Sequence, residues 1–275
     1  MQNNNLKISF IGGGNMAAAL IGGLADKLTA GANIHVVDIN LEALARLQQQ
    51  FGITTSGEID AALANSDVIV LAVKPQQMKG VVTQLLPHIG KQLILSIAAG
   101  IRAADLSRWM GGHDAIVRTM PNTPALIGKG VTGMVATEGV SAQQREIADA
   151  ILRAVGETVW LADESQIDSV TAVSGSGPAY VFYFLEAMQQ AAQELGLTAE
   201  QGNALAVSTF VGAAQLAAQS SDPVSVLRER VTSKGGTTYA ALCTMEQFDV
   251  KGAIIKAMKA AASRGRELGE EFGKD

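Results

Sequence analysis

The stretch from Leu6 to Ala17, LKISFIGGGNMA, most constrains what this chain can fold into. Its first six residues form a short, mostly apolar run that is typical of a buried parallel strand. The run ends at Gly12, Gly14 follows, and a helical pattern begins at Met16. A strand, a glycine turn and a helix in this order direct free backbone N–H groups and the positive end of a helix dipole at a pyrophosphate. Ala17 occupies the third fingerprint position, where a small residue lets the helix pack closely on the strand.

Further short apolar runs place this turn in a repeating α/β pattern. The run from Ile34 to Val37 ends at Asp38, 21 residues after Ala17, which is close to the usual spacing of a ribose-binding acidic residue. Helical patterns separate these runs, which indicates a doubly wound sheet. The other expected strands are Val68 to Val73, Leu93 to Ile97, Val131 to Ala136 and Glu157 to Leu161, with a helix from Gln143 to Val155 between the last two.

After Ala162 the strand pattern ends and only helices are expected. Two of them, Pro178 to Ala192 and Ala204 to Ala218, are apolar nearly all round, and a partner subunit is the simplest source of cover for such helices. Thr198 and Asp222 are the expected N-caps. The expected helices are Ser165 to Val173, Pro178 to Leu195, Ala199 to Ser220, Pro223 to Val231, Tyr239 to Gln247 and Val250 to Gly269.

These patterns predict a two-domain α/β chain. A Rossmann-type dinucleotide-binding domain is expected over residues 1–162, followed by an all-α substrate-binding and dimerisation domain over residues 163–275. The composition, with 48% hydrophobic and 17% charged residues, suits a globular protein with much buried surface.

Charge and cysteine content exclude several classes of function. The net charge is −5 and no basic stripe is present, so nucleic acid is not an expected partner. The single cysteine, Cys243, excludes an internal disulfide and suits a reducing compartment. The most apolar helix is too short to span a bilayer, and the N-terminus does not resemble a signal peptide. We therefore expect a cytoplasmic protein with no membrane attachment.

A second glycine turn, TSKGGTT from Thr232 to Thr238, precedes the helix that begins at Tyr239. Two glycines flanked by hydroxyl residues form a candidate anion nest, in which successive N–H groups hold a small carboxylate. An ordinary turn between helices would have the same composition. Spacing alone leaves both interpretations open.

The chain resembles the pyrroline-5-carboxylate reductase family along essentially its whole length. The segment from Pro223 to Glu246, and above all TSKGGTTYAAL, carries the specific part of the resemblance, whereas FIGGGNMA is generic. Lys234 stands where many members of the family carry proline, which bears on the rigidity of the loop. The remaining motifs, in the family's order, are AVKP (Ala72 to Pro75), SIAAG (Ser96 to Gly100), MPNTP (Met120 to Pro124) and SGSGPAY (Ser174 to Tyr180).

This resemblance implies reduction of the cyclic imine 1-pyrroline-5-carboxylate to L-proline by NADPH or NADH, the last step of proline synthesis. It implies that Thr238 is the catalytic hydroxyl beside the imine nitrogen and that Thr237 and Gly236 bind the carboxylate. Ser233 and Glu164 are further substrate contacts, and the helices form a homodimer or a higher homo-oligomer of dimers. The expected cofactor contacts, with Asp38 and Asn40 added from the end of the second strand, are Ile11, Gly12, Gly13, Gly14, Asn15, Met16, Ala72, Val73, Lys74, Pro75, Ile97, Ala98 and Ala99.

The residue inventory suits this chemistry. A protonated imine is already electrophilic, so the enzyme has mainly to hold its carbon against C4 of the nicotinamide. The histidines, His35, His88 and His113, lie outside the matched motifs, and Cys243 is expected to be a packing residue. No Cys/His group has metal-ligand spacing, so no metal is expected.

The choice between the two dinucleotides stays open in the sequence. Asp38 can accept hydrogen bonds from a ribose 2′-OH and would repel a 2′-phosphate, which favours NADH. The family resemblance favours NADPH.

Two other functions compete with this interpretation. β-Hydroxyacid dehydrogenases share a similar plan but place a catalytic lysine four residues after the second glycine of a GxG motif. Here that motif is Gly175 and Gly177, and the position is Val181, which cannot polarise a hydroxyl. A protein that senses NAD(P) without turnover is the other alternative, but it would have no need of the glycine-threonine loop.

Overall fold

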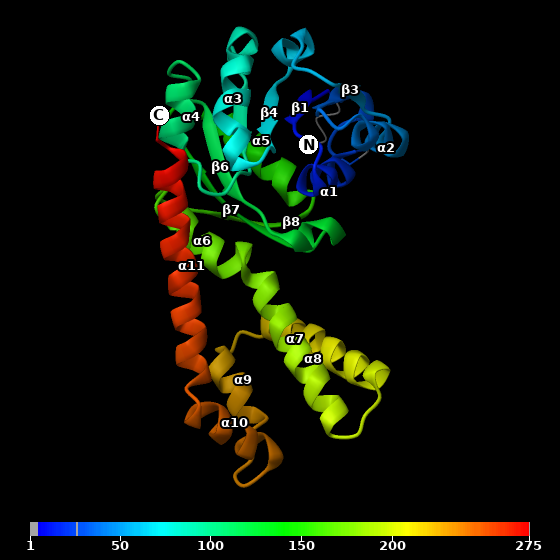
Figure 1. Cartoon of the computed structure of the whole chain (residues 1–275), viewed down its shortest axis with the longest axis vertical. Helices are drawn as coiled ribbons and strands as arrows, with labels where there is room; N and C mark the ends of the chain where they lie inside the picture. Colours follow the sequence, from blue (N-terminus) through cyan, green and yellow to red (C-terminus); the bar gives the residue numbers. More distant parts are fainter. Residues whose placement is uncertain (1–4, 26, 275) are drawn as a thin grey trace. The chain divides into compact units, whose positions relative to one another are not determined.

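The computed structural model describes residues 5–25 and 27–274. Contacts divide the chain into two compact units (Figure 1). The first unit comprises the chain up to Ser176 together with the segment from Ala261 onward, and the second runs from Gly177 to Ala260. The contacts thus assign residues 163–176 to the sheet-bearing unit. The functional boundary after residue 162 stays a prediction.

The first unit is built on a sheet with the strand order β3-β2-β1-β4-β5-β6-β7-β8. All neighbouring strands are parallel except β6 and β7, which are antiparallel. This confirms the doubly wound α/β sheet. The strands are β1 (Ile8–Ile11), β2 (Ile34–Val37), β3 (Thr54–Ser56), β4 (Val68–Leu71), β5 (Leu93–Ser96), β6 (Ile116–Met120), β7 (Gly130–Ala136) and β8 (Gly156–Trp160).

Helices cover both faces of this sheet (Figure 1). Alternate strand residues point to opposite faces, so Val68 and Val70 join one buried cluster while Ile69 and Leu71 join the other. The first cluster includes residues of α1, α2 and α5, and the second includes residues of α3 and α4. These helices, with the short α6, are α1 (Asn15–Leu24), α2 (Leu41–Phe51), α3 (Pro75–Leu85), α4 (Ala103–Trp109), α5 (Ala142–Arg153) and α6 (Gln166–Val170).

The second unit is helical, as predicted. Each expected helix is present, and the predicted helix from Ser165 to Val173, in the first unit, is divided into α6 and a π-helical turn at Thr171–Gly175. No described helix combines the length and the hydropathy that crossing a bilayer requires. The helices of the second unit are α7 (Gly177–Glu194), α8 (Ala199–Gln219), α9 (Val224–Arg230), α10 (Thr237–Gln247) and the first part of α11 (Val250–Phe272).

Of the two predicted N-caps, Thr198 is confirmed and Asp222 is wrong. Thr198 caps α8, and with Gln201 it forms a complete capping box. Asp222 is not the N-cap of α9, which is Pro223 without a side-chain cap. The Asp222 carboxylate instead pairs with Arg230, the last residue of α9, at 2.6 Å.

Asp149 on α5 joins this helix to β8. Its carboxylate accepts hydrogen bonds from Thr158 Oγ1 at 2.7 Å, Trp160 Nε1 at 3.0 Å and Arg153 Nε at 2.5 Å. Partial burial alone would raise the pKa of Asp149, but these three hydrogen bonds outweigh it and lower the pKa. The guanidinium of Arg145 stacks on the ring of Trp160, with its carbon 3.9 Å from the ring centroid.

We expect Asp149→Ala to lower the free energy of unfolding by about 1–3 kcal/mol, because partly buried donors on Thr158 and Trp160 lose their acceptor. Glu146→Ala, at an exposed position of the same helix, is the control and should stay within about 0.5 kcal/mol of the parent. Urea unfolding at pH 7 measures both. Because the pKa of Asp149 is lowered, its contribution is present at neutral pH and is lost as the pH falls below about 4. An equal cost at pH 7 and pH 3 would contradict this account.

Candidate functional site

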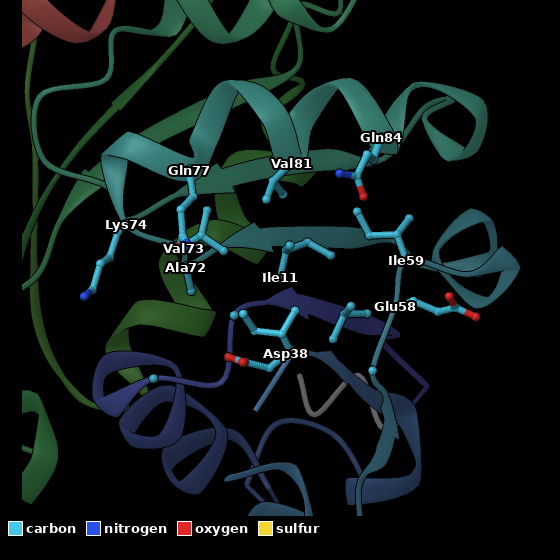
Figure 2. A pocket seen from close by; sticks show the side chains of 15 residues that line it. Ile11, Asp38, Glu58, Ile59, Ala72, Val73, Lys74, Gln77, Val81 and Gln84 are labelled. Atoms are coloured by element: carbon cyan, nitrogen blue, oxygen red, sulfur yellow. The ribbon is translucent and has the colours of Figure 1, made fainter. Parts of the chain in front are cut away.

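A cavity of about 440 Å³ opens at the carboxyl ends of β1, β2 and β4 (Figure 2). The strand order reverses direction at β1, and such switch points are where open α/β sheets bind ligands. In Figure 2, α3 lines one side of the cavity and Asp38 lies on the opposite side, with Lys74 and Glu58 toward its two ends. The lining residues are Ile11, Gly12, Gly14, Val37, Asp38, Ile39, Gly57, Glu58, Ile59, Ala72, Val73, Lys74, Gln77, Val81 and Gln84.

The two fingerprint glycines have different physical roles. Gly12 has a φ of +103°, and a Cβ there would lie 2.6 Å from the carbonyl oxygen of Ala72. Glycine is therefore required where the turn after β1 crosses the end of β4. Gly14 has a φ of −70°, and a Cβ there would meet nothing within 4 Å. The space beside Gly14 is open, which leaves room for a ligand to approach the backbone.

The first turn of α1 has uncapped N–H groups that can bind an anion. Gly14 is its N-cap, and no side chain caps the helix. The N–H groups of Asn15 and Met16 begin the helix, where the dipole favours negative charge. This open N-terminus beside the cavity fits a pyrophosphate.

Asp38 connects the glycine loop to the turn after β2. Its Oδ2 accepts the Gly13 N–H at 2.6 Å and its Oδ1 accepts the Asn40 N–H at 2.8 Å. The side chain of Asn40 in turn accepts the Ala43 N–H at 3.1 Å and caps α2. The Asp38 side chain is thereby held at the edge of the cavity.

Seven of the fifteen predicted cofactor contacts line this cavity. Ile11, Gly12, Gly14, Asp38, Ala72, Val73 and Lys74 line it, and Lys74 is the N-cap of α3, whose first residue is Pro75. Gly13, Asn15 and Met16 adjoin this lining in the loop and the first turn of α1. Asn40 caps α2 outside the lining, and Ile97, Ala98 and Ala99 follow β5, also outside the lining.

Several lining residues escaped the sequence analysis. Gln77, Val81 and Gln84 are spaced by four and three residues, so they share one face of α3, and this helical spacing was a usable signal. Glu58 and Ile59 follow β3, a strand too polar to be recognised from an apolar run.

Glu164 makes two contacts in the first unit. Its Oε1 accepts the Ala103 N–H at the start of α4 at 2.7 Å and pairs with Arg118 at 2.9 Å. Arg118 on β6 is only 4% exposed, so this pair neutralises a buried guanidinium. The predicted contact of Glu164 with the substrate stays a prediction.

The glycine-threonine loop lies in the second unit and opens α10. Gly235 has a φ of +74°, and a Cβ on Gly236 would lie 2.6 Å from Ser233 Oγ. Gly236 is the N-cap of α10 without a side-chain cap, so the first-turn N–H groups of Thr237 and Thr238 are available to an anion. The geometry is that of the candidate carboxylate nest, with Lys234 exposed beside it.

His35 and Cys243 neither line the cavity nor belong to the glycine-threonine loop. His35 Nδ1 lies 2.9 Å from Thr54 Oγ1, and its Nε2 lies 3.5 Å from Asp60. Cys243, predicted to be a packing residue, is exposed in the chain by itself, and its hydrogen bond with Tyr239 raises the pKa of that phenol. Among the described residues, no group of three or more His, Cys, Asp or Glu side chains could hold a metal ion.

Gly12 and Gly14 allow a matched test of the loop between β1 and α1. We expect Gly12→Ala to destabilise the protein by at least about 2 kcal/mol, because it combines a positive φ with a clash against Ala72. Gly14→Ala should cost less than about 1 kcal/mol in stability and still weaken binding of NADH or NADPH, because its methyl group occupies the open space. Thermal unfolding and dinucleotide titration measure both variants. A Gly14→Ala protein that binds dinucleotides as tightly as the parent would place the ligand elsewhere.

Comparison with known proteins finds matches to both parts of the chain. Residues 164–268 match the family described as pyrroline-5-carboxylate reductase dimerisation, and residues 7–100 match the one described as NADP oxidoreductase coenzyme F420-dependent. The pyrroline-5-carboxylate reductase of Pseudomonas aeruginosa is 46% identical over 97% of this chain and 98% of its own length. That of Haemophilus influenzae is 41% identical over 95% and 97%.

Solved structures agree with these relatives. The pyrroline-5-carboxylate reductase structure from Coxiella burnetii has a TM-score of 0.90 at 40% identity and covers 96% of this chain and 99% of its own. The pyrroline carboxylate reductase of Plasmodium falciparum, solved with NADP bound, has a TM-score of 0.88 at 28% identity, with 97% and 99% covered. The chain therefore belongs to the pyrroline-5-carboxylate reductase family.

Proposed function

We propose that this chain reduces 1-pyrroline-5-carboxylate to L-proline with NAD(P)H. The observation that carries the proposal is the N-terminus of α10, where Gly236 leaves N–H groups uncapped for a carboxylate, in a chain that matches this family over 97% of its length. The cavity at β1, β2 and β4 supports the cofactor assignment, because Gly14 leaves open space in front of an uncapped helix. We also propose a cytoplasmic location, which the single cysteine suits.

Two helix N-termini bind the reactants, that of α1 the cofactor and that of α10 the substrate. The start of α1 holds the pyrophosphate, with Lys74 at the start of α3 as a nearby positive charge. Gly236 and Thr237 hold the substrate carboxylate through backbone N–H groups, and Ser233 and Glu164 are further substrate contacts. Bound NAD(P)H supplies the hydride. The protein's main task is then to orient the imine carbon toward it.

Thr238 acts on the ring nitrogen. A protonated imine donates its N–H to the hydroxyl oxygen, whereas the amine formed after hydride arrival can accept from the hydroxyl hydrogen. A threonine serves both states without changing its charge. The ring nitrogen changes from a hydrogen-bond donor to an acceptor along the reaction. The contact with Thr238 therefore contributes to kcat as well as to binding.

We expect Thr238→Ala to lower kcat/KM by about ten- to a hundredfold, the cost of a hydrogen bond to a charged group, roughly 1.5–3 kcal/mol. Dinucleotide affinity should be nearly unchanged. Thr238→Ser keeps the hydroxyl and should retain most of the activity. Steady-state kinetics of both variants measures this, and equal losses would point to the methyl group and loop packing instead of the hydroxyl.

The function itself is tested by mixing the purified chain with 1-pyrroline-5-carboxylate and each reduced dinucleotide. Oxidation of the dinucleotide with formation of L-proline is the expected result. Dinucleotide binding without oxidation would favour the non-catalytic sensor. The β-hydroxyacid dehydrogenase alternative is disfavoured, because Val181, at the position of its lysine, lines an apolar cavity of the second unit.

We also propose that the second unit forms a homodimer. Its helices expose large apolar side chains, with Phe182 64%, Tyr183 77% and Phe248 72% exposed. A cavity of about 620 Å³ lined by apolar and aromatic side chains opens between α7, α8 and α11. A monomeric soluble protein rarely leaves so much apolar surface in contact with water.

Light scattering at micromolar concentration should therefore give a mass of at least twice 28.6 kDa. Tyr183→Asp, which places a charge on this apolar surface, should lower the mass toward that of the monomer. A monodisperse 28.6 kDa parent protein would refute the dimer.

A further inference from the structure

The Asp38 carboxylate is held so that it faces the cavity with acceptor capacity to spare. A carboxylate offers about four lone-pair sites. One on each oxygen is used, by the Gly13 N–H at 2.6 Å and by the Asn40 N–H at 2.8 Å. One acceptor site on each oxygen is left, which matches the two adjacent hydroxyl groups of a ribose.

This carboxylate is not free to turn away. Gly13 is buried, so rotation of Asp38 would leave its N–H group without a partner inside the protein. A ligand that brings a negative charge to this edge of the cavity must therefore meet the carboxylate where it stands.

The surroundings offer little to neutralise such a ligand. Lys74 is the one basic side chain among the described lining residues, and Figure 2 places it at the end of the cavity away from Glu58. Glu58 lines the cavity, and Glu42 lies in the first turn of α2. The start of α2 is itself closed by the Asn40 side chain, so that helix N-terminus is not open to a phosphate.

We propose that this chain selects NADH over NADPH and that Asp38 is its specificity-determining residue, with Glu58 adding to the repulsion. The inference rests on the proposed use of this cavity for NAD(P)H. The 2′-OH of NADH donates to the free acceptor site of Asp38. The 2′-phosphate of NADPH is mostly dianionic at neutral pH, so it is repelled by Asp38 and, from the end of the cavity, by Glu58.

Binding of dinucleotide fragments tests this without any turnover. Calorimetric titration of the full chain with ADP-ribose and with 2′-phospho-ADP-ribose should show at least about tenfold tighter binding of ADP-ribose at low salt. The preference should narrow as salt is raised from 0.05 to 0.5 M, because added ions screen the repulsion. Equal affinities, or tighter binding of the phosphorylated fragment, would overturn the selectivity. If neither fragment binds, the dinucleotide site itself is wrong.

Charge variants separate repulsion from loop packing. Glu58→Gln should raise the relative affinity for 2′-phospho-ADP-ribose about two- to fivefold, because no described hydrogen bond depends on that carboxylate. Glu138→Gln makes the same change in net charge at an exposed turn outside the cavity and should leave the ratio unchanged. Ile39→Arg, at a position that is 84% exposed in the lining, should raise the ratio at least about tenfold while keeping the Asp38 contacts.

Asp38 itself is tested by Asp38→Ser. The shorter side chain cannot bridge Gly13 and Asn40, so the affinity for both fragments should fall, and the ratio should shift at least about tenfold toward 2′-phospho-ADP-ribose. A loss of affinity with an unchanged ratio would mean that Asp38 only supports the loop, and the proposal would be overturned. The steady-state ratio of kcat/KM for NADPH and NADH should follow the same order across the variants.

Discussion

The candidate dinucleotide site depends on the close passage of the Gly12 backbone over the carbonyl of Ala72. The parallel pairing of Ile11 with Leu71 brings the ends of β1 and β4 level, so the turn after β1 must cross the end of β4. Only a residue without a Cβ can do this, because a Cβ on Gly12 would lie 2.6 Å from the carbonyl oxygen of Ala72. Asp38 then ties the next peptide of the turn to the end of β2. Three strand ends thus hold one loop, and that loop determines where α1 begins and where its uncapped N–H groups point.

The proposed sites for the cofactor pyrophosphate and the substrate carboxylate are of the same kind. In each unit a glycine without a side-chain cap begins a helix, Gly14 for α1 and Gly236 for α10. Backbone N–H groups bind anions without the entropy cost of ordering long side chains. Hydride transfer to an electrophilic imine needs orientation more than an acid, a base or a nucleophile. Under the proposed function, a single hydroxyl, that of Thr238, is a sufficient polar group at the reacting nitrogen.

The sequence analysis found what depends on local pattern and missed what depends on distant partners. The strands β1, β2, β4 and β5 are apolar runs and were predicted, as were the fingerprint glycines and Asp38. The edge strand β3 is the polar tripeptide TTS. The strand β6 carries Arg118 and Thr119, whose buried polar groups find Glu164 and the Ser96 carbonyl, 46 and 23 residues away. No residue close to β6 in the sequence indicates these partners. The pairing of Asp222 with Arg230 spans only eight residues, but the sequence offered a competing local role for Asp222 as an N-cap.

The most direct test of this account is a crystal structure of the chain with NADH and L-proline, two reduced molecules that cannot react with each other. The account predicts the pyrophosphate against the N–H groups at the start of α1 and the proline carboxylate against Gly236 and Thr237, with Thr238 Oγ1 within hydrogen-bond distance of the ring nitrogen. Proline bound away from the start of α10, or a pyrophosphate away from Gly14, would contradict it.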